Sequence, residues 1–503
     1  MDDPSASNAN AHSTEEAPFK KGLGSRLAWV GAASSAVAVL DLLAIVLILK
    51  FWVTPATYGI ATIVVTLFWA LQLAAELGLS AAVIQRDGHS QEQLSTLFWM
   101  NVMFGVIFYA VIWVGSPYFA LLHDEPVIES LCKVFGINLL VRSGYAMHHA
   151  QLRKQLRFRE LSIVRIIGNL LEFSFKVGTA AAGFGVWCFV AGSMARSLTL
   201  FVGLPLINKW RPSFVFQPKK CLGDIVFGAR SAGGEILFQV YSNLDYQVIS
   251  IFFGKEVLGI YRAAYELVLE PVRFISGVVV SVAFPAFSKV KNNLKEVAKL
   301  YAQFTTQNLV VVLSLLVLIL ISAEDLLTII FKEEYAVAAT AARILAIVGV
   351  FRALSHIAPP LLEGLGRPDL TLRYQITAAI LVSGLFFGFA YYLGDQFGYV
   401  VVAAAWAVGY PIAFTMLSIM VFRLSKMSVY DWLKAIAMVP FSIALGGLLG
   451  LGAHLAAREL SPLPRLVIVI TVLAISIGFF LAKFAKISPR SVLRAVKDEP
   501  VSN

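Results

Sequence analysis

Apolar stretches of about 20 residues follow one another along almost the whole 503-residue chain. A helix needs about 20 mainly apolar residues to cross the hydrocarbon core of a bilayer, so each stretch is long enough to span a membrane. About 14 stretches can be distinguished, from residues 27–49 to residues 466–482. The pattern predicts an all-α polytopic membrane protein with about 14 transmembrane helices.

The order of the spans predicts the domain organisation. We expect two six-helix lobes, at residues 27–208 and 224–422, joined by a cytoplasmic loop at 209–223. Two C-terminal helices follow within residues 432–482. Residues 1–26 are polar and have no apolar run, so we expect a disordered cytoplasmic tail there. Residues 483–503 are expected to form a basic cytoplasmic tail.

An internal repeat favours the two lobes. Gly59 and Gly259 occupy matching positions at the second and eighth spans, and Arg142 and Arg352 occupy matching positions at the fourth and tenth. Six helices return the chain to the same side of the membrane. The lobes would therefore be parallel repeats about an axis along the membrane normal.

The distribution of Lys and Arg between loops predicts the orientation. One set of loops, together with both termini, holds about 26 basic residues, whereas the opposite set holds about five. Those five are Lys50, Lys255, Lys332, Arg458 and Arg465. Because cytoplasmic loops are rich in Lys and Arg, both termini should be cytoplasmic.

Composition excludes most enzyme classes. The chain is 58% hydrophobic and 14% charged, with a mean hydropathy of +0.77. The net charge of +10 reflects loop topology and attraction to lipid headgroups, not nucleic-acid binding. The sequence has no phosphate-binding G-x-x-x-x-G-K-[ST] loop and no H-E-x-x-H zinc motif, and its three cysteines lack metal-ligand spacing. We expect no catalytic residue, no metal and no cofactor.

Charged residues inside the spans are the candidate functional residues. A charge at the centre of a membrane helix costs about 2.5–3.5 kcal/mol, so it normally faces a cavity or a partner. The candidate substrate-binding residues are Arg142, Arg165, Arg196, Arg230, Arg352 and His356, with Lys176 as a further cavity cation. The candidate coupling or cavity carboxylates are Glu76, Glu172, Asp245, Glu266, Glu270 and Glu363.

Two groups of these charged residues, each on one face of a predicted helix, have a second interpretation. Arg165, Asn169, Glu172 and Lys176 recur at helical spacing, so they line either a polar cavity or a self-paired stripe. Residues 262–273 repeat the pattern with two arginines and two glutamates, and the same alternatives apply. Pro359-Pro360 should bend or break the tenth span, either as a moving part or as a plain kink.

Arginine outnumbers lysine among the charges within the spans. Its planar guanidinium binds phosphate oxygens in pairs and keeps its charge when it is buried. A cavity that gathered Arg142, Arg165, Arg196, Arg230 and Arg352 would suit a diphosphate.

Several short motifs carry a family resemblance. Residues 53–59 (VTPATYG) resemble the turn L-x-P-x-x-Y-G, and residues 76–85 (ELGLSAAVIQ) resemble D-x-G-L-x-x-A-x-I-Q with Glu76 in place of Asp. Residues 149–158 (HAQLRKQLRF) resemble A-x-L-x-R-x-L-x-F. In this order, the motifs resemble the polysaccharide-repeat-unit (Wzx-type, O-antigen and exopolysaccharide) flippases of the multidrug/oligosaccharidyl-lipid/polysaccharide exporter superfamily.

The resemblance implies a transporter, not an enzyme, that moves undecaprenyl-diphosphate-linked oligosaccharide to the periplasmic leaflet by alternating access. It implies coupling to H⁺ or Na⁺, contact with membrane lipids, and a polysaccharide polymerase and chain-length or export proteins as partners. The alternative is a multidrug exporter, or an exporter of another lipid-linked precursor, from the same superfamily. A cavity for cationic drugs would be apolar or acidic, whereas these spans are rich in arginine.

The orientation can be tested with reporter fusions. Alkaline phosphatase fused after Lys332 should be active, because that loop is predicted to be periplasmic, and the same enzyme fused after Lys295 should be inactive. Activity in the reverse pattern at both sites would overturn the predicted orientation.

Overall fold

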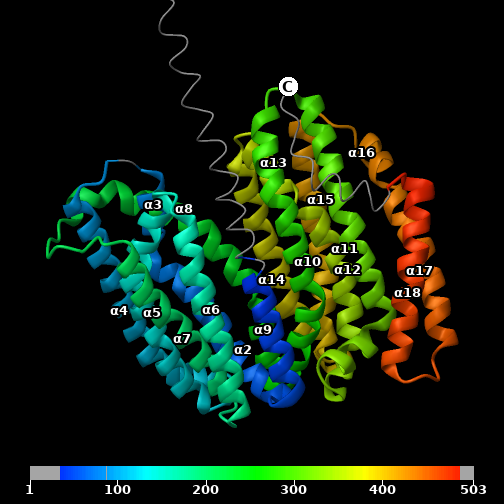
Figure 1. The fold of residues 1–503 in the computed structure, drawn as a ribbon, viewed down its shortest axis with the longest axis horizontal. Helices are drawn as coiled ribbons and strands as arrows, with labels where there is room; N and C mark the ends of the chain where they lie inside the picture. Colours follow the sequence, from blue (N-terminus) through cyan, green and yellow to red (C-terminus); the bar gives the residue numbers. More distant parts are fainter. Residues whose placement is uncertain (1–33, 35, 87, 488–503) are drawn as a thin grey trace, which may run out of the picture. The chain divides into compact units, whose positions relative to one another are not determined.

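The protein is helical throughout the part that the structure describes (Figure 1). The computed structural model describes residues 34, 36–86 and 88–487, except for the side chains of Arg230, Ser231 and Glu235. No β-strand occurs among these residues. The prediction of an all-α fold is confirmed, while the predicted tail at 1–26 and most of the basic tail at 483–503 lie outside the described residues.

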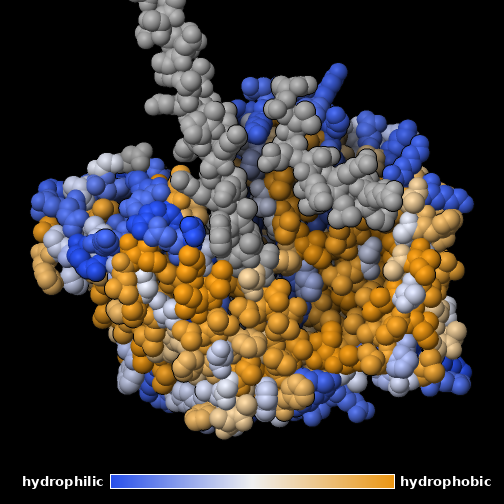
Figure 2. Space-filling model, viewed as in Figure 1, coloured by the Kyte–Doolittle hydropathy of each residue, from blue (hydrophilic) through white to orange (hydrophobic). Residues whose placement is uncertain are grey.

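Ten helices in the described part of the chain are long and apolar enough to cross a membrane. In Figure 2, the visible surface of each unit is mainly hydrophobic over its middle and hydrophilic towards its ends. Helices α5 (Val127–Lys154) and α6 (Phe158–Ala181) have comparable lengths but carry several charges. The protein is therefore a multi-pass membrane protein, and the count of fourteen spans stays a prediction.

The chain divides into two compact units. Unit 1 comprises Met1–Val53 and Val64–Ile236, and unit 2 comprises Thr54–Ile63 and Leu237–Asn503. Helices α2 (Pro55–Glu76) and α8 (Leu222–Ser242) each contribute residues to both units. The remaining named helices of unit 1 are α3 (Leu79–Gln85), α4 (Gln91–Leu122), α5, α6, α7 (Trp187–Ile207) and the 3₁₀ turn Pro218–Cys221.

Unit 2 contains the helices from α9 onward. They are α9 (Leu244–Phe253), α10 (Lys255–Val290), α11 (Leu294–Ile330), the 3₁₀ turn Glu333–Ala338, α12 (Ala339–Ser355), α13 (Ala358–Gly364), α14 (Pro368–Phe397), α15 (Val400–Ser425), α16 (Val429–Ile436), α17 (Met438–Ala456), α18 (Pro462–Phe480) and the π-helical turn Leu481–Ala485. Consecutive long helices such as α10 and α11, α14 and α15, and α17 and α18 pack against each other.

The predicted break at the double proline is confirmed. Helix α12 ends at Ser355, and the short helix α13 begins at Ala358 with Pro359 in its first turn. Proline has no backbone N–H and its ring clashes with the preceding turn, so the helix cannot continue through this point. The break separates Arg352 and His356 from Glu363 on the next helix.

The two repeat glycines meet each other where α2 and α10 begin. A Cβ built on Gly59 would overlap the carbonyl oxygen of Lys255, and one built on Gly259 would overlap the carbonyl oxygen of Pro55. Each glycine therefore lies against the backbone of the other helix. Only the absence of a side chain allows this approach, which explains why the same residue type recurs at both positions.

An ion pair attaches the C-terminal helices to α11. Asp325, 1% exposed near the end of α11, accepts hydrogen bonds from Arg465 of α18, with 2.9 Å between Nε and Oδ2. His454 of α17 lies 3.8 Å from the same carboxylate. Because a buried carboxylate needs a partner, Arg465 fixes α18 against α11.

The glycine contact predicts opposite effects for two substitutions in α10. Gly259→Ala should destabilise the protein by about 1–3 kcal/mol, because the new methyl group meets backbone atoms that cannot move aside. Gly277→Ala, where nothing lies within 4 Å, should be neutral or should stabilise by about 0.5–1 kcal/mol. Thermal unfolding in detergent measures both, and equal melting temperatures would contradict the close packing.

Candidate substrate-binding site

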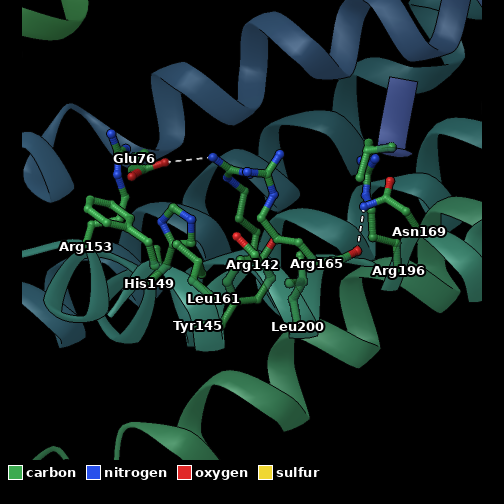
Figure 3. A pocket seen from close by; sticks show the side chains of 14 residues that line it. Glu76, Arg142, Tyr145, His149, Arg153, Leu161, Arg165, Asn169, Arg196 and Leu200 are labelled. Carbon is green, nitrogen blue, oxygen red and sulfur yellow. Dashed lines mark hydrogen bonds and ion pairs between the residues drawn. The ribbon is translucent and has the colours of Figure 1, made fainter. Parts of the chain in front are cut away.

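The described part of unit 1 contains a polar cavity of about 500 Å³ (Figure 3). Five helical segments line it. Its lining residues are Val37, Glu76, Arg142, Tyr145, Ala146, His149, Arg153, Phe158, Leu161, Ser162, Arg165, Asn169, Arg196 and Leu200. Figure 3 shows Arg142 and Arg165 near the centre, with Arg153 and Arg196 towards opposite ends.

Helical spacing explains why these residues share one cavity. On α5, the lining positions 142, 146, 149 and 153 follow steps of four and three residues, with position 145 beside 146, so their side chains share one helix face. On α6, positions 158, 161, 162, 165 and 169 follow the same steps, and α7 adds positions 196 and 200. One face of each of the three helices α5, α6 and α7 therefore lines the same cavity.

The cavity carries more positive than negative charge. Glu76 pairs with Arg142, with 3.0 Å between Oε2 and Nη2. Arg153 and Arg165 make no ion pair with a carboxylate among the described residues, and the Arg142 Nε is buried without a hydrogen-bond partner there. Two guanidinium groups therefore remain for an anionic ligand.

Arg196 links the cavity to a neighbouring charge cluster. Glu172 of α6 is 6% exposed and pairs with two cations, Lys176 at 2.9 Å and Arg196 at 2.9 Å. Asp41, on the helical segment 36–51, lies within electrostatic range of all three. The self-paired stripe therefore exists on α6, and the cavity exists beside it. The two interpretations of this face do not exclude each other.

A second buried polar cluster lies in unit 2. Asp245 of α9 is fully buried and accepts hydrogen bonds from the Tyr261 hydroxyl at 2.9 Å and from the Trp406 indole nitrogen at 3.0 Å. Both donors are neutral. Nearby, Glu266 of α10 accepts hydrogen bonds from Arg262 and, at 3.3 Å, from the Tyr58 hydroxyl.

Arg352 belongs to the same part of unit 2. Its Nη1 donates to the Tyr265 hydroxyl at 2.7 Å, and its guanidinium carbon lies 4.4 Å from the centroid of the Trp406 ring. His356 Nδ1 lies 2.6 Å from the carbonyl oxygen of Arg352. The aromatic rings compensate the buried charge by cation–π contact.

The structure brings together some of the residues that the sequence singled out. Arg142, Arg165, Arg196 and Glu76 line one cavity, and Glu172 and Lys176 adjoin it. The remaining candidates belong to unit 2. Arg352, His356, Asp245 and Glu266 are in its polar cluster, Glu270 pairs with Arg273 at 2.5 Å, and Glu363 is exposed near the end of α13. The Arg230 side chain lies outside the described residues. A joint grip on one ligand by Arg142 and Arg352 stays a prediction.

Sequence reasoning missed several lining residues. His149 and Arg153 follow Arg142 by seven and eleven residues, which is two and three helical turns, so they share its face of α5. Arg153 lies near the end of α5 and is one of the basic residues on the side predicted to be cytoplasmic, so the loop pattern alone gives it a role only in orientation. The spacing from Arg142 was the signal that could have identified both residues.

The fold is shared with a solved membrane protein. The structure matches the lipid II flippase MurJ in its inward closed conformation with a TM-score of 0.72 and 15% sequence identity, over 90% of this chain and 99% of that one. This likeness defines the fold.

The sequence identifies the family. The family described as polysaccharide biosynthesis protein matches residues 48–340, more than half of the chain, and the protein belongs to it. The teichuronic acid biosynthesis protein TuaB of Bacillus subtilis is 28% identical over 80% of this chain and 83% of its own length. The lipopolysaccharide biosynthesis protein WzxC of Escherichia coli is 22% identical, over 64% of this chain and 66% of its own. The resemblance seen in the motifs is confirmed.

The two-cation arrangement at Glu172 predicts unequal effects for its members. Glu172→Gln should destabilise the protein by about 3–5 kcal/mol, because Lys176 and Arg196 are then left as adjacent cations without a counter-charge. Lys176→Met should cost much less, since Glu172 keeps Arg196. Thermal unfolding in lipid nanodiscs measures both variants, and a larger loss for Lys176→Met would show that Arg196 does not neutralise the carboxylate.

Proposed function

We propose that the protein is a flippase for a lipid-linked oligosaccharide, moving undecaprenyl-diphosphate-linked repeat units from the cytoplasmic to the periplasmic leaflet of a bacterial inner membrane. Such units are the building blocks of surface polysaccharides. The observation that carries the proposal is the cavity of unit 1, which holds four arginines and only one glutamate among its lining residues.

The charge of the cavity matches a diphosphate. Arg153 and Arg165 have no carboxylate partner among the described residues, so they provide two positive charges for the two negative charges of a diphosphate diester. Guanidinium groups bind phosphate oxygens in a bidentate geometry, and they keep their charge in a low-dielectric site. The glycan would occupy water-filled space next to the diphosphate, and the lipid tail would stay in the bilayer through a lateral gap.

The membrane potential favours outward movement of this cargo. When the inside of the membrane is negative, moving one negative charge outward is favourable by about 2.3 kcal/mol per 100 mV. A diphosphate that crossed without its counter-charges would gain about twice that amount. Arginines that bind it tightly then make release the difficult step of the cycle.

Glu172 offers a route to release. It already pairs with Arg196, which lines the cavity, so its carboxylate and the cargo compete for one guanidinium. Protonation of Glu172, or binding of Na⁺ to it, would leave Arg196 to the diphosphate, and loss of that ion would favour release. Cargo binding would thereby be coupled to binding of H⁺ or Na⁺. An ion lost together with the cargo on the periplasmic side would move outward with it, and the membrane potential acting on the remaining negative charge would drive the movement. Asp41 and Asp245 are further carboxylates through which the same ion could act.

The same proposal includes the topology and the partners. The cytoplasmic termini follow from the Lys and Arg distribution of the loops, and the two six-helix lobes, with the pair of C-terminal helices after them, follow from the internal repeat and the order of the spans. A polymerase and chain-length or export proteins would act on the repeat units after translocation. Export of cationic drugs is the rival function, and the excess of arginine in the cavity disfavours it because like charges repel.

The proposal predicts a selective loss of cargo binding. Arg165→Gln should weaken binding of undecaprenyl diphosphate by about tenfold or more, because a hydrogen-bonded charge pair contributes about 1.5–3 kcal/mol. Arg165→Lys should restore only part of this, since lysine binds as a point charge. Native mass spectrometry with undecaprenyl diphosphate measures binding, and proteoliposomes with a labelled lipid-linked oligosaccharide measure flipping with and without an imposed H⁺ or Na⁺ gradient.

The matched control is Arg159→Gln. Arg159 is on the same helix, is exposed and does not line the cavity, so binding and flipping should stay near the wild-type level. Equal loss in both variants would indicate a general effect of charge. Full binding and flipping by Arg165→Gln together with Arg153→Gln would exclude this cavity as the diphosphate site. If the wild-type protein flips the lipid equally well without an ion gradient, ion coupling is excluded, but the proposal of a flippase is not.

A further inference from the structure

A groove outside the arginine cavity lies at one end of unit 2. Its volume is about 770 Å³, and it is lined by the first turns of α11, the end of α15, the turn at 426–428 and the short helix α16. Figure 1 shows α16 at the same end of the molecule as α13. This is the end at which α11 and α16 begin, and the basic loops there are predicted to be cytoplasmic.

The groove combines an apolar floor with basic residues. Leu294, Ala298 and Ala302 of α11 provide apolar lining, and Lys295 and Lys299 flank them on the same helix. Lys426, in the turn before α16, adds a third cation. All three lysines are exposed.

The net charge of the residues that line the groove is positive, because the acidic residues are fewer than the lysines. Asp431 is the one carboxylate among the lining residues, and Lys299 has Glu296 at 3.5 Å. Lys295 and Lys426 make no ion pair among the described residues. The groove therefore has two cations free to meet an anion.

A side chain that lines the same groove carries a buried donor without a partner among the described residues. The Trp432 side chain lines the groove and is 5% exposed, and its Nε1–H has no hydrogen-bond partner among the described residues. The ring is held in place because it stacks on Tyr301, with centroids 6.1 Å apart, and meets Phe422 edge-on at 5.5 Å. A buried N–H without a hydrogen-bond partner destabilises the folded protein, and a ligand that accepts its hydrogen bond would remove this cost.

The outer face of α16 indicates contact with lipid. Trp432 and Ile436 are buried against the protein, whereas Val429 and Leu433, one turn apart, are each 49% exposed. Tyr430 between them is 70% exposed. A short helix with an apolar outer face, an aromatic residue and adjacent lysines is typical of a segment that lies at the membrane–water interface.

From this combination we infer that the groove binds an anionic glycerophospholipid of the surrounding bilayer. The phosphate would be held by Lys295, Lys426 and the Trp432 N–H, and an acyl chain would lie along the apolar lining of α11. Basic pockets between membrane helices at the headgroup level have the chemistry that such lipids require. The groove shares no lining residue with the arginine cavity of unit 1, and the inference does not depend on the identity of the cargo.

Native mass spectrometry of the purified full-length protein tests the inference. Dioleoyl phosphatidylglycerol and dioleoyl phosphatidylcholine are titrated separately. The wild-type protein should bind phosphatidylglycerol in preference. Lys295→Gln and Lys426→Gln should each weaken that binding about fivefold, because one lysine near an anionic headgroup contributes about 1 kcal/mol. Trp432→Phe keeps an aromatic ring but removes the N–H, and should weaken binding about tenfold.

Two further variants separate this site from general attraction. Lys434→Gln removes a charge from α16 at a position that does not line the groove, so binding should stay within about twofold of wild type. Asp431→Asn removes the only lining carboxylate and should tighten binding. Melting temperatures of all variants identify any that fail to fold.

Three results would overturn the inference. Equal binding of the two lipids would show ordinary annular lipid, and an equal loss in Lys434→Gln would show diffuse attraction to the charged end of the protein. Phosphatidylglycerol binding that appears only after removal of residues 488–503 would show that the chain's own C-terminal segment occupies the groove.

Discussion

The cost of placing charge in a low-dielectric environment governs this structure. The chain carries acids and bases inside helices that are otherwise apolar, and each must find a counter-charge, a hydrogen-bond donor or water. Arg465 meets Asp325, Arg142 meets Glu76, and Glu172 meets both Lys176 and Arg196. Except for Glu172–Lys176, which lies within α6, these pairs join different helices, so the compensation of charge also fixes the packing.

The two units compensate their buried charges in different ways. Unit 1 uses ion pairs around an open cavity, and it leaves Arg153 and Arg165 without carboxylate partners in the described part of the chain. Unit 2 surrounds Asp245 with neutral Tyr and Trp donors, and it places the Arg352 guanidinium over aromatic rings. An open basic cavity suits an anionic ligand, whereas a closed neutral shell suits a group that gains or loses a single small ion. This difference supports separate roles for the units in a transport cycle.

The groove beside α16 extends this reasoning to the membrane surface. Lys295, Lys426 and the Trp432 N–H have no partner there among the described residues, and we propose that lipid headgroups provide one. The same rule therefore applies at both sites. Where the described chain leaves a polar group without a partner, the solvent or ligand that reaches it should supply the missing charge or acceptor.

The sequence by itself determined the all-helical membrane fold, because hydrophobic length is a local property that needs no tertiary contact. It also determined the helix break at Pro359-Pro360, since proline acts on its own turn, and the family, through short motifs in order. Local spacing likewise gave the Glu172–Lys176 pair. Contacts between helices could not be read in this way. Only the tertiary structure showed that Arg196 shares Glu172, that Gly59 and Gly259 lie against each other's backbone, and that His149 and Arg153 face the arginine cavity. The physical reason is that hydropathy and spacing specify which face of a helix is polar, while the partner of that face depends on how distant helices pack.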